Sequence, residues 1–230
     1  MDRAVLHVVR KQAEAGIDIG NDGEQQRVGF QTYVPQRMSG FAGESKRRRG
    51  RDYEEFPELV EVLARRFPKR SKMQNAPEAQ ADLHYLDTSA IEREIDRLKR
   101  SVKEAGAFQD TFLTAPSPGI ISTTMLNAHY DSHEAYLTAL AREMRHEYLA
   151  IHNAGLLLQI DSPDLAMDRA MFYREASDAE FVQGIQRHVA ALNQAIEGIP
   201  RDLVRLYCCY GNWDGPHIFD AALELILPVL

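Results

Sequence analysis

Four times along the chain, a helix-like segment ends in a glycine and a short apolar, strand-like segment follows at once. The glycines are Gly16, Gly106, Gly155 and Gly198, and each stands where the end of a helix needs a residue in the left-handed conformation. Helices that alternate with strands over short connections predict an α/β fold with a parallel sheet. The apolar runs show no polar alternation, as expected for parallel strands that are covered on both faces.

Three long segments show the periodicity of amphipathic helices. Their apolar residues recur every three or four positions, and the segments follow the capping residues Ser89, Asp131 and Ser177. We therefore expect three long helices that begin near these residues. Their apolar stripes are most simply core faces that pack on the sheet, so we assign them no chemistry.

The spacing of the later glycines predicts the type of α/β fold. Gly106, Gly155 and Gly198 are each about 45 residues apart, which is the size of one strand–helix unit in a large barrel. Eight such units would need roughly 350 residues, whereas the chain has 230. The sequence therefore predicts a fold of the (β/α)8 TIM-barrel type that is incomplete, with about four of the eight strands.

No segment has the composition of a linker between domains. We predict a single partial barrel domain over residues 1–230, with an inserted excursion at about 25–87 between the first two strands. This excursion contains a basic run from Lys46 to Arg51 and a short helix that begins at Pro57. We interpret the basic run as a solvated loop.

Composition narrows the class of protein. The net charge of −7 argues against nucleic acid as a partner, and no run of 18 apolar residues predicts a membrane span. The first residues form an amphipathic pattern without the apolar core of a signal peptide. The two cysteines, Cys208 and Cys209, are adjacent and cannot build a disulfide framework, which indicates a reducing, cytoplasmic location.

Reactive groups of parallel α/β folds gather where strands end. Glu24 and Asp161 follow the first and third predicted strands, and neither directly precedes a strong helical stripe. Asp164 is more simply explained as a cap of the next helix. Cys209 would share a strand face with Tyr207, and a buried free cysteine is usually structural. As a metal ligand, Cys209 would need partners from other strands.

Four motifs together resemble the cobalamin-independent methionine synthase family, and in particular its short members that correspond to the C-terminal catalytic domain. They occur in the family's order and cover almost the whole chain. The motifs are VVRKQAEAGIDIGNDGE (8–24), FLTAPSPG (112–119), EYLAIHNAGLLLQIDSPDLA (147–166) and RLYCCYGNWDGPH (205–217).

This resemblance implies a zinc-dependent S-methyltransferase on a (β/α)8 barrel. The expected partners are a homocysteine-like thiol and a methyl-folate, usually methyltetrahydropteroyltriglutamate. Zinc lowers the pKa of the bound thiol, so that a thiolate exists at neutral pH and can attack the methyl group. Carboxylates near the metal would hold the amino group of the substrate by charge-assisted hydrogen bonds.

The resemblance also assigns roles to individual positions. Glu24 matches the glutamate that contacts homocysteine, and Asp161 matches the aspartate that binds its amino group. Cys209 matches the zinc cysteine of a His-x-Cys pair, but Tyr207 occupies the position of the histidine. Tyrosine is a poor zinc ligand at neutral pH because its pKa is about 10. The family's first strand would precede Met1, and its remaining zinc ligands would follow the last residue of this chain.

Other functions remain open at this point. The acceptor could be another thiol such as coenzyme M, or the chain could be a catalytically silent, truncated paralogue that serves as a binding or interaction module. A metal-free barrel of the uroporphyrinogen decarboxylase type is disfavoured by the exit Cys209-Tyr210-Gly211-Asn212. An incomplete barrel also leaves strand edges unpaired, which predicts pairing with another chain.

Overall fold

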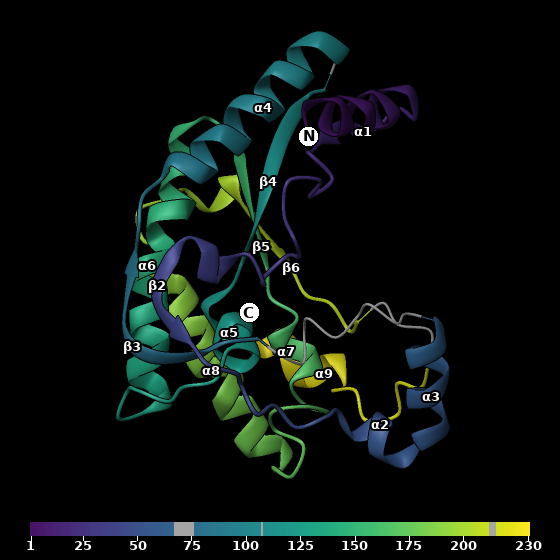
Figure 1. Cartoon of the computed structure of the whole chain (residues 1–230), viewed down its shortest axis with the longest axis vertical. Helices are drawn as coiled ribbons and strands as arrows, with labels where there is room; N and C mark the ends of the chain where they lie inside the picture. Colours follow the sequence, from purple (N-terminus) through teal and green to yellow (C-terminus); the bar gives the residue numbers. More distant parts are fainter. Residues whose placement is uncertain (67–75, 107, 212–214) are drawn as a thin grey trace.

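The computed structural model describes residues 1–66, 76–106, 108–211 and 215–230. Four parallel strands form its main sheet in the order β1-β4-β5-β6 (Figure 1). Pro116 of β4 lies beside Asp161 of β5, which in turn lies beside Tyr207 of β6, so these strands end at a common edge. The predicted α/β fold with a parallel sheet is confirmed. The strands are β1 (Ile19–Gly20), β4 (Asp110–Pro116), β5 (Leu157–Asp161) and β6 (Val204–Tyr207).

Three long helices pack side by side against one face of this sheet (Figure 1). They are α4 (Ser89–Ala105), α6 (His133–Asn153) and α8 (Asp178–Ala195). The predicted stripes on α4 and α6 are buried in one apolar core together with Leu113 of β4 and with Leu158 and Ile160 of β5. The assignment of these stripes to the core is therefore confirmed.

The ends of the helices agree with the sequence in most places. All four glycines, Gly16, Gly106, Gly155 and Gly198, have positive φ between 74° and 82°. At the start of α8, Ser177 and Glu180 form the predicted reciprocal cap. The other two starts differ. Thr88 precedes α4, and Ser132 caps α6 by accepting a hydrogen bond from the backbone N–H of Ala135.

The main sheet is open. Within the described residues, β1 and β6 lie at its two edges and the strands do not close into a barrel. Both edges expose apolar side chains: Ile17 and Ile19 at β1, and Leu206 and Tyr207 on β6. Unpaired strand edges of this kind can accept another strand.

The excursion at 25–87 forms structure of its own, apart from residues 67–75, which lie outside the described part of the chain. Strands β2 (Met38–Ala42) and β3 (Glu78–Tyr85) pair antiparallel, and β3 packs on α6. The helix predicted at Pro57 is α3 (Pro57–Arg66), preceded by the short α2 (Arg51–Glu55). The antiparallel pair was not anticipated from the sequence.

The remaining elements are short, except for the first helix, which packs on α4. No helix in the described part of the chain combines the length and the apolar character that crossing a membrane requires. These elements are α1 (Asp2–Glu14), α5 (Pro118–Thr124), α7 (Asp164–Met167), α9 (Leu223–Ile226) and the 3-10 turns Val34–Gln36, Arg201–Leu203 and Leu227–Val229.

Candidate functional site

Polar side chains gather at the carboxyl edge of the main sheet, on the face away from α4 and α6. Parallel register places Thr114 beside Gln159, and Asp161 beside Tyr207. Side chains alternate along a strand, so Gln159 and Asp161 share a face opposite to that of Leu158 and Ile160. The apolar core on one face thus fixes the direction of the polar groups on the other.

Glu24 reaches this edge from the loop after β1. The carboxylate of Asp22 accepts a hydrogen bond from the backbone N–H of Glu24 at 3.0 Å and holds a tight turn. Glu24 has φ of 55° and is the one non-glycine residue with positive φ in the part of the chain that the structure describes. Its carboxylate accepts a hydrogen bond of 2.8 Å from the hydroxyl of Thr114 on β4.

Asp161 lies at the end of β5 and is only 7% exposed. Burial raises the pKa of Asp161 to about 6; the hydrogen bond that the side chain of Gln159 donates opposes this rise, and the charge of Glu24 adds to it. The structure thus brings the two carboxylates predicted from the strand exits close enough for the charge of Glu24 to act on the pKa of Asp161. Their role in binding a substrate stays a prediction.

Tyr207 and Cys209 follow on β6 and in the loop after it. The phenol of Tyr207 makes a hydrogen bond with the thiol of Cys209, and this contact raises the pKa of Tyr207, with a smaller contribution from Asp161. Cys209 also accepts a hydrogen bond from the backbone N–H of Gly211 at 3.1 Å. Cys208 points the other way and packs in an apolar cluster with Leu165 and Phe181, so the two thiols do not converge.

The zinc ion that the resemblance implies does not fit the residues at this edge. Cys209 is a suitable donor, but Tyr207 carries a neutral phenol where a histidine would bind. Within the described residues, which exclude 212–214 of the last motif, no three His, Cys, Asp or Glu side chains come together to hold a metal ion. A structural or catalytic zinc site needs at least three protein ligands.

A buried network of charges lies beside the site and was missed from the sequence. Arg27 donates to Glu94 at 3.0 Å, and Arg37 bridges Glu94 and Glu147, with 2.8 Å to the latter. The two guanidinium groups lie 4.4 and 4.3 Å from the ring centre of Tyr33, whose hydroxyl donates to Glu147. Although burial alone would raise the pKa of Glu147, the two arginines hold it below its ordinary value.

This network connects the excursion to the site. Arg27 donates to the carbonyl oxygen of Thr114 at 2.7 Å, and the hydroxyl of the same threonine donates to Glu24. One sequence signal could have revealed the network. Glu147 falls on the apolar face of α6 beside Met144 and Tyr148, and a charge on a core face requires a buried partner.

A second cluster of polar side chains, around Asp164, connects the segments that follow β4 and β5. Asp164 accepts hydrogen bonds from Ser117 at 2.7 Å and from Ser162 at 2.9 Å, and it lies 2.9 Å from the ring of His188. The expectation that Asp164 serves simply as a helix cap is therefore wrong. His133 contacts the other ring nitrogen of His188 at 3.2 Å, and burial lowers the pKa of His133 to about 4. Sequence spacing could not pair His133 with His188, because they are on different helices.

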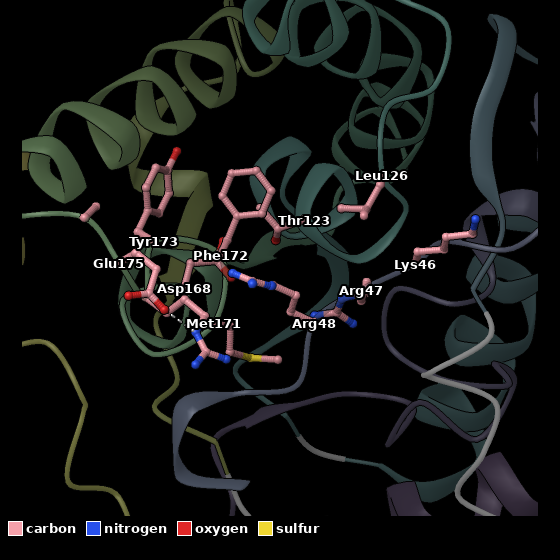
Figure 2. Close-up of a pocket in the computed structure, with 12 residues that line it drawn as sticks. Lys46, Arg47, Arg48, Thr123, Leu126, Asp168, Met171, Phe172, Tyr173 and Glu175 are labelled. Atoms are coloured by element: carbon pink, nitrogen blue, oxygen red, sulfur yellow. Dashed lines mark hydrogen bonds and ion pairs between the residues drawn. The ribbon is translucent and has the colours of Figure 1, made fainter. Parts of the chain in front are cut away.

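A cavity of about 350 Å³ opens next to this cluster (Figure 2). Lys46, Arg47 and Arg48 line one side of it, and Asp168 and Phe172 line the other. Lys46, Arg48 and Arg49 of the basic run are exposed in a loop, as predicted, whereas Arg47 is partly buried against the loop after α7.

Comparison with known proteins was made at three levels. No family model matches the chain. The methionine synthase of Sulfolobus acidocaldarius is 23% identical over 226 residues, which cover 97% of this chain and 56% of that protein. The chain therefore spans about half the length of the curated relative it matches.

Solved structures show the same likeness. A B12-independent methionine synthase from Shewanella sp. W3-18-1, in complex with selenomethionine, superposes with a TM-score of 0.64 at 22% identity, over 91% of this chain and 51% of that one. The protein from Listeria monocytogenes assigned as a vitamin-B12-independent methionine synthase gives 0.59 at 19% identity, over 90% and 54%. At this identity the superpositions show the fold. Together with the sequence match, they confirm the resemblance that the four motifs indicate: this chain is similar to cobalamin-independent methionine synthases over about half of their length.

Proposed function

We propose that the chain carries the amino-acid-binding part of a methionine-synthase-like thiol S-methyltransferase, on a sheet that is a portion of a (β/α)8 barrel. The observation that carries the proposal is the pair of carboxylates, Glu24 and Asp161, which meet at the carboxyl edge of the sheet. Two carboxylates at such an edge suit the ammonium group of an amino acid.

The neighbouring groups favour binding of an ammonium group. Asp161 has little contact with solvent, and the negative charge of Glu24 makes its ionisation unfavourable. An ammonium group between the two would relieve this repulsion and donate hydrogen bonds to both carboxylates. Thr114 and Gln159 hold the carboxylates in place through hydrogen bonds of 2.8 and 3.0 Å.

Homocysteine is the acceptor that this arrangement favours over coenzyme M. Homocysteine carries an ammonium group that pairs with the carboxylates, whereas coenzyme M carries a sulfonate that they would repel. We propose methyl-folate as the methyl donor by analogy with the relatives. Methyl transfer requires the acceptor as a thiolate. Since the described residues do not complete a zinc site, we assign this chain recognition of the substrate and no step at a metal.

A second function is favoured by Tyr207. With a phenol in place of a histidine beside Cys209, the chain is suited to act as a binding module that holds an amino-acid thiol without turnover. Pairing with another chain through the edges of β1 and β6, and a cytoplasmic location, stay predictions in either case.

Calorimetric titration with L-homocysteine tests the proposal. We expect Glu24→Gln and Asp161→Asn each to weaken binding about 10- to 100-fold, because a charge-assisted hydrogen bond contributes about 1.5–3 kcal/mol. Asp110→Asn is the matched control, since this exposed aspartate lies at the opposite end of β4. Equal affinity of all four proteins would exclude the assigned roles.

Tyr207→His separates the enzyme from the binding module. This variant restores a His-x-Cys pair, so we expect it to bind zinc more tightly than the wild type, as measured by metal analysis after dialysis against a chelator. Methylation of homocysteine by the wild-type chain, with methyl-folate and zinc supplied, would support the enzyme. Binding of homocysteine without methylation would support the module.

A further inference from the structure

The cavity beside the basic run is separate from the carboxylate site. Neither Glu24 nor Asp161 lines it, and neither does Cys209. Its walls come from the excursion, from the end of α5 and from the loop after α7 (Figure 2). A volume of about 350 Å³ lies within the range of pockets that hold small molecules.

Asp168 is a buried acid whose hydrogen bonds are incomplete. It is 1% exposed, and its Oδ2 atom has no hydrogen-bond partner within the described residues. Burial and the charge of Asp164 raise the pKa of Asp168 to about 7, while His188, Thr123 and Arg47 act in the opposite direction. An unpaired buried acceptor destabilises the folded state, so such an atom points to a partner that binds there.

Arg47 is a cation on the same cavity whose hydrogen bonds are also incomplete. Its guanidinium group is largely removed from solvent, which lowers its pKa, and the negative charge of Asp168 opposes this effect. Within the described part of the chain, Arg47 makes no hydrogen bond or ion pair. Arg174, on the same cavity, is bound to Glu54, Glu175 and the carbonyl oxygen of Arg49. Among the described residues, the cavity therefore contains one partly buried cation, Arg47, and one buried carboxyl oxygen without direct partners, whereas the cations Lys46 and Arg48 are exposed.

An unpaired cation and an unpaired acceptor on one cavity complement a ligand that carries both an anion and a donor. Leu126, Met171 and Phe172 provide an apolar part of the lining, and Thr123, Tyr173 and Glu175 add polar groups. We propose that the cavity binds a small zwitterion, an α-amino acid with an apolar side chain, whose carboxylate pairs with Arg47 and whose ammonium group pairs with Asp168. The exposed Lys46 and Arg48 at the rim attract the carboxylate.

Titration calorimetry with L-leucine tests this site, because leucine has no thiol and is no methyl acceptor. Two analogues complete the experiment: 4-methylpentanoate lacks the ammonium group, and 3-methylbutylamine lacks the carboxylate. We expect L-leucine to bind at least tenfold more tightly than either analogue. The proposal is overturned if leucine does not bind or if one analogue binds as tightly as leucine. If leucine does not bind, ordered water would be the occupant of the cavity.

Variants locate the binding. Arg47→Gln and Asp168→Asn are each expected to weaken leucine binding tenfold or more, whereas Arg49→Gln, in the same basic run but outside the cavity, is not. Arg47 makes no hydrogen bond or ion pair with another described residue, so Arg47→Gln removes no contact on which folding depends. If Arg49→Gln weakened leucine binding equally, the loss would be explained by the net charge of the basic run, and the proposed site would be overturned.

The double variant Glu24→Gln/Asp161→Asn distinguishes this site from the proposed substrate site. We expect it to lose homocysteine binding and to keep leucine binding. Loss of leucine binding in this variant would assign the amino acid to the carboxylate pair and overturn the second site. Whether this variant still binds homocysteine tests the proposed function and does not test the second site.

Discussion

The Arg27–Arg37–Glu94–Glu147 network and the Asp168 cavity both hold charged groups away from water. They differ in whether each charged group has a partner of opposite charge. In the network, each guanidinium group has a carboxylate partner and stacks on the ring of Tyr33. In the cavity, Arg47 and the Oδ2 atom of Asp168 lack such partners among the residues that the structure describes. Both regions place arginines of the excursion against other parts of the fold, the network against α4 and α6 and the cavity against α5 and the loop after α7. The difference indicates that the network serves the fold and that the cavity serves a ligand.

The largest expected effect comes from breaking the network. Glu147→Gln keeps the shape of the side chain but leaves Arg37 without one of its two carboxylates. Breaking a buried ion pair on one side costs about 3–5 kcal/mol, so we expect the free energy of unfolding to fall by this amount. Urea denaturation at neutral pH measures it. A loss below 1 kcal/mol would mean that the network is not what holds the excursion.

A smaller effect of opposite sign is expected at the cavity. The pKa of Asp168 is about 7 in the folded chain, above its value of 3.8 in the unfolded one, so the folded state binds more protons between these values. Its contribution therefore makes the protein less stable as the pH rises from about 4 to 7.

Asp168→Asn removes that dependence. We expect this variant to be more stable than the wild type at pH 8 by about 1–4 kcal/mol, and equally stable at pH 4. Thermal unfolding followed by circular dichroism at both values checks it. The same gain at both pH values would contradict a role for the ionised carboxyl group.

The smallest effect is expected at an exposed ion pair. Arg10 of α1 lies 2.7 Å from Glu104 of α4, and both side chains are more than half exposed. Solvent screens such pairs, so Glu104→Gln should change the free energy of unfolding by less than about 0.5 kcal/mol. A cost near that of Glu147→Gln would show that burial is not what separates the two regions.

Much of the fold was predictable because its signals are local. A glycine with positive φ follows each of the long helices α1, α4, α6 and α8, and the capping box of Ser177 and Glu180 begins α8, whatever the chain does elsewhere. Glu24 and Asp161 were predictable for a related reason, since parallel strands end at one edge and bring the residues after them together. The start of α6 was missed because Ser132 and Asp131 are both good caps, and only the local backbone decides between them.

The charged interior was not predictable in the same way. Arg27 and Arg37 lie in irregular segments of the excursion, and their partners are 57 to 110 residues away in sequence. Neither periodicity nor spacing can report such a contact. The Tyr207–Cys209 contact lies between these cases, since alternation placed both residues on one side and the hydrogen bond required the structure.

The backbone of Glu24 has a consequence for any redesign of this protein. A glutamate at φ of 55° costs about 1–2 kcal/mol relative to glycine, which adopts that conformation freely. A redesign guided by stability alone would therefore replace Glu24 with glycine and report an improved protein. The carboxylate that faces Asp161 would be gone. The melting temperature would rise, but the protein would lose a group that we propose binds the substrate.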